Sequence, residues 1–105
     1  MIKVSMLYPN KEGGRFDVDY YLGHHVPLSV SRFGAALKGY SVEQGINAGL
    51  SGSRPPYLFA SHLLFDSLEA FHAAFEPHAE ELMLDMHNYT DIEMLVQISE
   101  VKVSG

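Results

Sequence analysis

The chain of 105 residues contains no cysteine, few basic residues and no long apolar run. The absence of cysteine excludes disulfide bonds, thiolate catalysis, iron–sulfur clusters and zinc fingers. No apolar run approaches the roughly 18 residues of a membrane span. The N-terminal segment is too short and too interrupted for the apolar core of a signal peptide. We therefore expect a cytoplasmic protein that does not cross a membrane.

The shortage of basic residues also limits the expected partners. Lys and Arg number 7 against 13 Asp and Glu, and the second half of the chain has only Arg54 and Lys102 as basic residues. Without a basic patch, a surface cannot neutralise a phosphate backbone or attach to an anionic membrane. We therefore expect neither nucleic acid nor membrane as a partner, and we interpret the acidic half as a solvated helix face that favours solubility.

Alternating or continuous apolar segments predict four strands within one domain that spans residues 1–105. The predicted strands cover residues 2–8, 40–46, 57–65 and 93–103. The third strand is apolar on both faces apart from Ser61 and His62, so both faces should be covered. The apolar phase of the fourth strand shifts, which indicates a bulge near Ser99 or Glu100. Glycine and proline residues in the segment 48–56 predict a loop.

Two helices are predicted between these strands. Asp17 is a suitable N-cap for the first, and Gly39 is suited to stop it after Lys38. The second helix begins with a capping-box pattern at residues 66–69 and is interrupted by Pro77. An apolar stripe at helical spacing marks the inner side of the first helix: Val18, Leu22, Val26, Val30, Phe33 and Leu37.

The resulting order, β-α-β-β-α-β, predicts a ferredoxin-like α+β fold with a four-stranded antiparallel sheet and both helices on one face. This arrangement leaves the other face of the sheet uncovered. A third strand that is apolar on both sides then requires a second sheet against the open face. We therefore expect a homodimer.

The first helix contains a predicted kink beside two histidines. Pro27 lacks a backbone N–H, and its ring collides with the carbonyl of Gly23, four residues earlier. At about 100° per residue, His25 lies about 70° from the centre of the apolar stripe, and His24 about 170° away. We therefore expect His25 to face the cleft between helix and sheet, and His24 to face solvent.

Histidine side chains titrate near neutral pH and suit acid–base chemistry. A structural histidine that is hydrogen-bonded at the kink is the alternative for His25, and spacing alone favours it. His62 lies in an apolar strand, where burial would shift its pKa, but a strand histidine with its hydrogen bonds satisfied is the slightly favoured alternative. Tyr21 and Tyr40 are typical of core residues with one satisfied hydroxyl. Site residues and structural residues both remain possible at these positions.

Sequence signatures of cofactor and metal sites are absent. The histidine spacing forms no H-E-x-x-H motif, and the glycines form neither a G-x-G-x-x-G motif nor a P-loop. No serine lies in a nucleophile elbow. We therefore expect neither a metal nor an organic cofactor.

Two segments carry a resemblance to a known family. Residues 21–28 have the pattern aromatic-x-x-x-H-x-P-L, and residues 85–91 have the pattern D-x-x-N-aromatic-T-D. In this order they resemble the EthD-like (ethyl tert-butyl ether degradation) family of dimeric α+β barrel proteins. The likeness extends over nearly the whole chain, including Tyr8-Pro9 and residues 64–70.

The resemblance implies a ferredoxin-like subunit and a dimer whose two sheets form a barrel. Proteins near this family include cofactor-free muconolactone isomerases, polyketide cyclases and proteins known only from degradation operons, and wider relatives bind haem. In the isomerase-like members, a histidine of the first helix and a tyrosine early in the second strand serve the site. His25 matches the first by motif, and Tyr40 matches the second by position.

These observations lead to an expected function in a catabolic pathway. The first hypothesis is a cofactor-independent acid–base enzyme, of the isomerase, cyclase or decarboxylase type, for a small apolar or aromatic substrate with a carbonyl group. Its predicted catalytic residues are His25, Tyr40 and His62, and its predicted substrate contacts are Tyr21 and Leu28. The alternative is a non-catalytic accessory protein that binds a hydrophobic pathway intermediate. A third hypothesis is haem binding through His25 or His62.

Overall fold

The computed structural model describes residues 1–49 and 52–105, and in them four strands form an antiparallel sheet in the order β2-β3-β1-β4. The strands are β1 (Ile2–Pro9), β2 (Gly39–Gln44), β3 (Tyr57–Phe65) and β4 (Leu95–Glu100). These four antiparallel strands confirm the predicted sheet. The predicted loop at 48–56 includes residues 50 and 51, which lie outside the described residues.

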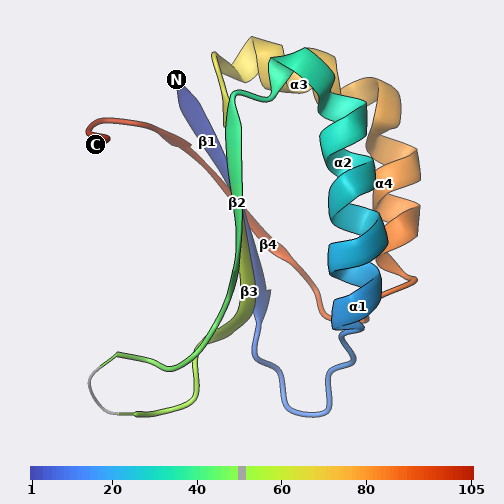
Figure 1. Ribbon diagram of the computed structural model, residues 1–105, viewed down its shortest axis with the longest axis vertical. Coiled ribbons are helices and arrows are strands. Elements are labelled where there is room, and N and C mark those ends of the chain that lie inside the picture. Colours follow the sequence, from blue (N-terminus) through green and yellow to red (C-terminus); the bar gives the residue numbers. More distant parts are fainter. Residues whose placement is uncertain (50–51) are drawn as a thin grey trace.

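The helical layer covers one face of the sheet (Figure 1). Its first half consists of α1 (Val18–Tyr20), a π-helical turn η1 (Tyr21–His25), α2 (Val26–Phe33) and a 3-10 turn η2 (Gly34–Ala36). Its second half consists of α3 (Leu68–Phe75), a 3-10 turn η3 (Glu76–His78) and α4 (Ala79–Met86). The element order confirms the ferredoxin-like α+β fold.

The helix ends confirm some capping predictions and correct others. The Asp17 carboxylate accepts a hydrogen bond from the Tyr20 backbone N–H at 3.1 Å, as predicted. The predicted stop at Gly39 is wrong, because α2 already ends at Gly34, whose φ of 58° breaks the helix. The cap of the second helix is Ser67 rather than the first residue of the capping-box pattern, since the Ser67 hydroxyl accepts from the Ala70 N–H at 3.1 Å.

The strand bounds differ from the predictions at the two edges of the sheet. Strand β3 has the predicted bounds, whereas β2 begins one residue early and ends two residues early. The predicted bulge in the last strand is wrong, because β4 pairs with β1 in unbroken register from Leu95 to Glu100. The apolar phase shifts there because the strand ends, and the Val101 N–H makes a last hydrogen bond to the Met1 carbonyl at 3.0 Å.

Two side-chain clusters fill the space between the sheet and the helices. One is aliphatic and phenylalanine-rich and consists of Val4, Phe33, Leu63, Phe65, Phe71 and Leu82. The other is aromatic and consists of Tyr8, Tyr21, Phe59 and Tyr89. Three tyrosine hydroxyls are thus buried in the second cluster, where each needs a polar partner. This requirement places polar chemistry inside an otherwise apolar layer.

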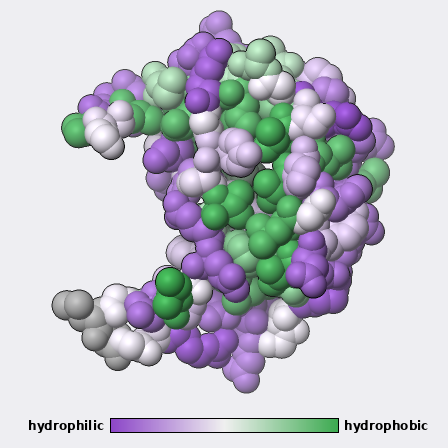
Figure 2. Space-filling model, in the orientation of Figure 1, coloured by the Kyte–Doolittle hydropathy of each residue, from purple (hydrophilic) through white to green (hydrophobic). Residues whose placement is uncertain are grey.

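The second face of the sheet carries no helix in the described residues (Figure 1). Figure 2 shows this side as a hollow between the C-terminal residues and the segment that follows β2. Side chains of β3 on this face, including Leu58, His62 and Leu64, are only partly buried. None of the helices in residues 1–49 and 52–105 has the length and apolar character needed to cross a membrane.

Candidate functional site

A cavity of about 90 Å³ lies between the helices and the sheet. Its lining is largely apolar and includes four methionines, Met6, Met83, Met86 and Met94. Figure 2 shows apolar side chains gathered between the sheet and the helices on the visible face. The polar residues of the lining are Tyr8, Tyr21, His25, Ser29, Tyr40 and Ser61. A mostly apolar cavity with a few convergent polar groups is the usual form of a small-molecule site.

The π-helical turn η1 brings His25 to this cavity. The predicted kink takes the form of this turn, in which the Val26 N–H donates to the Tyr21 carbonyl, five residues earlier. Pro27 has no N–H to donate to the Gly23 carbonyl, so a regular α-helical turn would lack one hydrogen bond here. Single π-helical turns inside α-helices occur frequently at functional sites.

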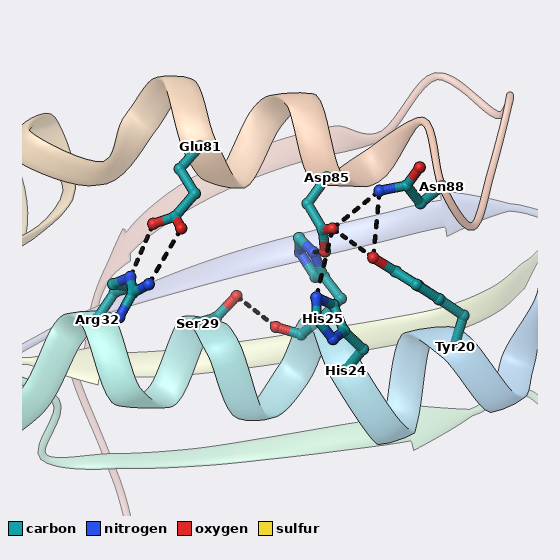
Figure 3. Close-up of polar contacts among 8 residues, drawn as sticks. All are labelled: Tyr20, His24, His25, Ser29, Arg32, Glu81, Asp85 and Asn88. Carbon is teal, nitrogen blue, oxygen red and sulfur yellow. Dashed lines mark hydrogen bonds and ion pairs between the residues drawn. The ribbon is translucent and has the colours of Figure 1, made fainter.

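His25 is hydrogen-bonded to a carboxylate at the end of α4 (Figure 3). Its Nδ1 lies 2.9 Å from Oδ2 of Asp85, and the two side chains are only 12% and 10% exposed. The other carboxylate oxygen, Oδ1, accepts hydrogen bonds from the Tyr20 hydroxyl at 2.6 Å and from the Asn88 amide at 3.1 Å. His24 is 56% exposed, which confirms its predicted orientation toward solvent, and its Nε2 lies 3.7 Å from Asp85 Oδ1.

The protonation states of this pair follow from burial and hydrogen bonding. Burial alone would raise the pKa of the Asp85 carboxyl, but the hydrogen bonds that it accepts outweigh this effect and hold the pKa below its usual value. Burial lowers the pKa of His25, and its interactions with Asp85 offset only part of that shift. At neutral pH the pair is therefore a neutral imidazole beside an ionised carboxylate.

These states also determine which ring nitrogen of His25 carries the proton. An ionised carboxylate only accepts hydrogen bonds, so Nδ1 must donate to Asp85 and Nε2 keeps its lone pair. Within the described part of the chain, no hydrogen bond occupies Nε2. The His25 ring is flanked by the rings of Tyr21 and Tyr89, with centroids 6.0 Å and 4.7 Å away. The imidazole is thus held in place and offers a free proton acceptor.

Two pairs of hydroxyl groups lie on the sheet side of the same region. The Tyr8 and Tyr89 hydroxyls are 2.8 Å apart, and the Tyr21 hydroxyl is hydrogen-bonded to the Ser61 hydroxyl. Burial raises the pKa of Tyr8, Tyr21 and Tyr89. These phenols therefore remain protonated at neutral pH and act as hydrogen-bond donors rather than as bases.

Of the five predicted site residues, His25, Tyr21 and Tyr40 line the cavity. Tyr40 lies on the edge strand β2 and is 53% exposed, which places it at the rim. His62 lies on the opposite face of the sheet, where its Nδ1 is 2.8 Å from the Ser5 hydroxyl. Leu28 lies along a groove on the outer surface between α2 and α4 and packs against the aliphatic cluster. The geometry therefore separates His62 and Leu28 from the cavity.

Residue-by-residue reasoning missed Asp85, Ser61 and the hydroxyl pair of Tyr8 and Tyr89. Asp85 and Tyr89 belong to the D-x-x-N-aromatic-T-D segment, so the motif itself was the available signal. Ser61 was visible as a small polar interruption of an apolar strand. In the described residues, no group of three or more His, Cys, Asp or Glu side chains is arranged to hold a metal ion.

Comparisons with known proteins agree with this architecture. The EthD domain family matches residues 15–93. An EthD-like protein from Ralstonia eutropha JMP134 is 42% identical, with a TM-score of 0.92, over 99% of this chain and 94% of that chain. An ethyl tert-butyl ether degradation (EthD) family protein from Bacillus halodurans C-125 is 17% identical, with a TM-score of 0.78, over 97% of this chain and 99% of that chain.

A more distant similarity supports the fold alone. A dimeric ferredoxin-like protein of unknown function from Thermobifida fusca YX is 15% identical, with a TM-score of 0.58, over 95% of this chain and 90% of that chain. Comparison with the curated proteins gives no match. The similarities therefore establish family and fold, and the chemistry has to be argued from the site.

Proposed function

The chain belongs to the EthD family, and we propose that it is a cofactor-independent acid–base enzyme in which His25 moves a proton next to a carbonyl group. The observation that carries this proposal is the hydrogen bond from His25 Nδ1 to Asp85, which leaves the lone pair of Nε2 unused on a residue that lines a largely apolar cavity. The substrate class is a small apolar or aromatic carbonyl compound, since the cavity is largely apolar.

In the proposed step, Nε2 of His25 removes a proton from the carbon next to the carbonyl group. The C–H bond breaks, and its electron pair forms the C=C bond of an enolate. The π electrons of the carbonyl group move to the oxygen, and His25 becomes an imidazolium ion. Return of the proton to another carbon of a conjugated enolate completes an isomerisation. In a cyclisation, the enolate forms a C–C bond with a second carbonyl group of the same substrate, the π electrons of that carbonyl move to its oxygen, and the resulting alkoxide takes the proton from His25.

Asp85 supports this step from outside the cavity. Its negative charge favours the imidazolium form of His25 that appears during the transfer, and its position fixes the ring. The Tyr20 and Asn88 hydrogen bonds to Oδ1 hold the carboxylate in place. Asp85 itself is therefore a positioning residue, whereas His25 is the catalytic base. Tyr40 contributes a substrate contact at the rim.

The proposed active form is a homodimer. The uncovered face of the sheet carries the partly buried Leu58 and Leu64 of β3 and the 48% exposed Leu95 of β4. Water contact at such apolar side chains is unfavourable, and a second sheet would remove it. The Thermobifida fusca protein of similar fold is described as dimeric. Sedimentation equilibrium tests this assembly, and a monomer at micromolar concentration contradicts it.

The acid–base function can be tested with a simple ketone in place of the natural substrate. Acetophenone in D₂O exchanges its methyl protons for deuterium when a base forms the enolate, and NMR follows the loss of the methyl signal. We expect the protein to accelerate this exchange, His25→Ala to abolish the acceleration and His72→Ala, at an exposed position on α3, to retain it. An acceleration that survives His25→Ala contradicts the proposal. Tight binding without exchange, unaffected by His25→Ala, supports the accessory binding protein instead.

A further inference from the structure

Four buried hydroxyls, three from the aromatic cluster and one from Ser61, hold more protons than they use. Each hydroxyl has one proton to donate. The bond between Tyr8 and Tyr89 uses one proton, and the bond between Tyr21 and Ser61 uses a second. A hydrogen bond between the Tyr8 and Tyr21 hydroxyls links the two pairs and uses a third. Among the hydrogen bonds of the described residues, the fourth proton has no acceptor, so one donor is available to another molecule.

Two of these residues reach the cavity from the strands, and Tyr21 reaches it from the π-helical turn that also carries His25. Tyr8, Tyr21 and Ser61 all line the cavity and are only 1%, 2% and 3% exposed. Tyr8 and Ser61 project from the strands β1 and β3, whereas His25 belongs to the helical layer. If the hydroxyls hold an oxygen atom of a ligand, the adjoining part of the ligand lies toward the helices and His25.

We propose that Tyr8, Tyr21 and Ser61 form a subsite for an uncharged carbonyl oxygen, so that the cavity selects neutral ketones and aldehydes over carboxylates. The proposal deepens the acid–base function above and rests on it for the reaction, although not for the binding preference. It also assigns the oxygen contact to buried hydroxyls rather than to Tyr40 at the rim.

The preference for a neutral ligand follows from the distribution of charged residues around the cavity. Among the described residues that line it, none is Lys, Arg, Asp or Glu. The carboxylate of Asp85 lies 2.9 Å from Nδ1 of His25, which lines the cavity. A bound carboxylate would lose its hydration without gaining a cation, and the negative charge of Asp85 would repel it.

A preference for neutral ligands does not oppose the formation of an enolate inside the cavity. The negative charge then appears on the oxygen only while His25 gains a positive charge, so the net charge of the cavity stays constant. Donors that remain protonated stabilise such a developing oxyanion without reorganisation. The raised pKa of the three tyrosines keeps them in this form.

The remainder of the cavity fits an apolar body of adjustable size. An apolar cavity of about 150 Å³ binds benzene, so an aromatic ring requires the present cavity of about 90 Å³ to widen. Four methionines line it, and their unbranched side chains repack more readily than other apolar residues. A ring attached to one carbonyl group is therefore a suitable probe.

Three probes of similar size test the proposal: acetophenone, ethylbenzene and benzoate. NMR titration of the labelled protein near neutral pH gives the three dissociation constants. We expect acetophenone to bind at least about tenfold more tightly than benzoate. Loss of one hydrogen bond changes affinity by about two- to tenfold, so Tyr21→Phe and Ser61→Ala should weaken acetophenone by that factor and leave ethylbenzene unchanged. Tyr57→Phe, outside the cavity lining, is the control and should change neither.

Several results overturn the subsite. They are binding of benzoate as tight as that of acetophenone, equal effects of Tyr21→Phe on acetophenone and ethylbenzene, and no binding of acetophenone up to its solubility limit. Binding of acetophenone with the expected preferences but without deuterium exchange rejects the acid–base function and keeps the subsite. Exchange that depends on His25 together with a preference for benzoate rejects the subsite and keeps the function.

Discussion

Replacement of Asp85 by asparagine preserves the size of the side chain but changes what it can do for His25. In the native protein, all three partners donate to the carboxylate: Tyr20, Asn88 and His25. Asparagine has one accepting oxygen and one donating amide group. Because Oδ1 accepts two hydrogen bonds and Oδ2 one, we expect the asparagine oxygen to take the position of Oδ1. Its amide group then faces Nδ1 of His25.

The consequence of Asp85→Asn is a change of tautomer. Nδ1 must now accept, so the proton moves to Nε2 and the base is lost. A catalytic histidine held in the wrong tautomer loses on the order of 10⁴-fold in rate, and we expect a comparable loss in the acetophenone exchange assay. The charge-assisted hydrogen bond from His25 is also lost, which should lower the free energy of unfolding by about 1–3 kcal/mol.

The assay compares deuterium exchange and urea unfolding of the wild type, Asp85→Asn and Asp66→Asn. Asp66 is a matched control because its side chain is 65% exposed and lies at the far end of the helical layer, before α3. Asp66→Asn should retain the exchange rate. An exchange rate for Asp85→Asn within twofold of the wild type would refute the reasoning, since it would show that the carboxylate does not set the tautomer of His25.

Three further predictions concern stability. Because the pKa of His25 is lowered in the folded protein, the unfolded chain binds more protons just below about pH 6.5. The free energy of unfolding should therefore fall as the pH falls through this range. Urea unfolding of His25→Gln should show a weaker dependence of this free energy on pH than the wild type. Gly23→Ala should stabilise the protein by about 0.5–1 kcal/mol in thermal unfolding, because the added Cβ meets nothing within 4 Å. Gly45→Ala should destabilise it by about 1–3 kcal/mol, because its Cβ would collide with the Tyr57 carbonyl oxygen. Ser67→Ala should cost about 1 kcal/mol, since the hydroxyl caps α3 at the Ala70 N–H, and an unchanged midpoint would contradict this role.

Local signals in the sequence were sufficient for most of the fold. A short apolar segment after a loop predicted β3 with its observed bounds, and Asp17 was recognised as a cap because its effect extends over only three residues. The stop of the first helix was misplaced because two glycines, Gly34 and Gly39, compete for this role. Only the backbone conformation, a φ of 58° at Gly34, distinguishes them.

The candidate site was only partly predictable, for a physical reason. The face of a helix can be calculated, so the directions of His24 and His25 were predicted and agree with the observed exposures of 56% and 12%. The partner of His25 lies 60 residues away on another helix, and helical periodicity carries no information about such a contact. His62 was misplaced relative to the cavity because a strand that is apolar on both faces does not reveal which face the helices cover.

The central claim is that Nε2 of His25 is an unprotonated acceptor at neutral pH, and proton–nitrogen correlation NMR of the wild-type protein tests it most directly. The nitrogen shifts of a histidine ring distinguish its two neutral tautomers from the charged form. We predict a neutral His25 ring with the proton on Nδ1, in hydrogen-bond contact with Asp85. A proton on Nε2, whether in the other neutral tautomer or in an imidazolium ion, would contradict the account.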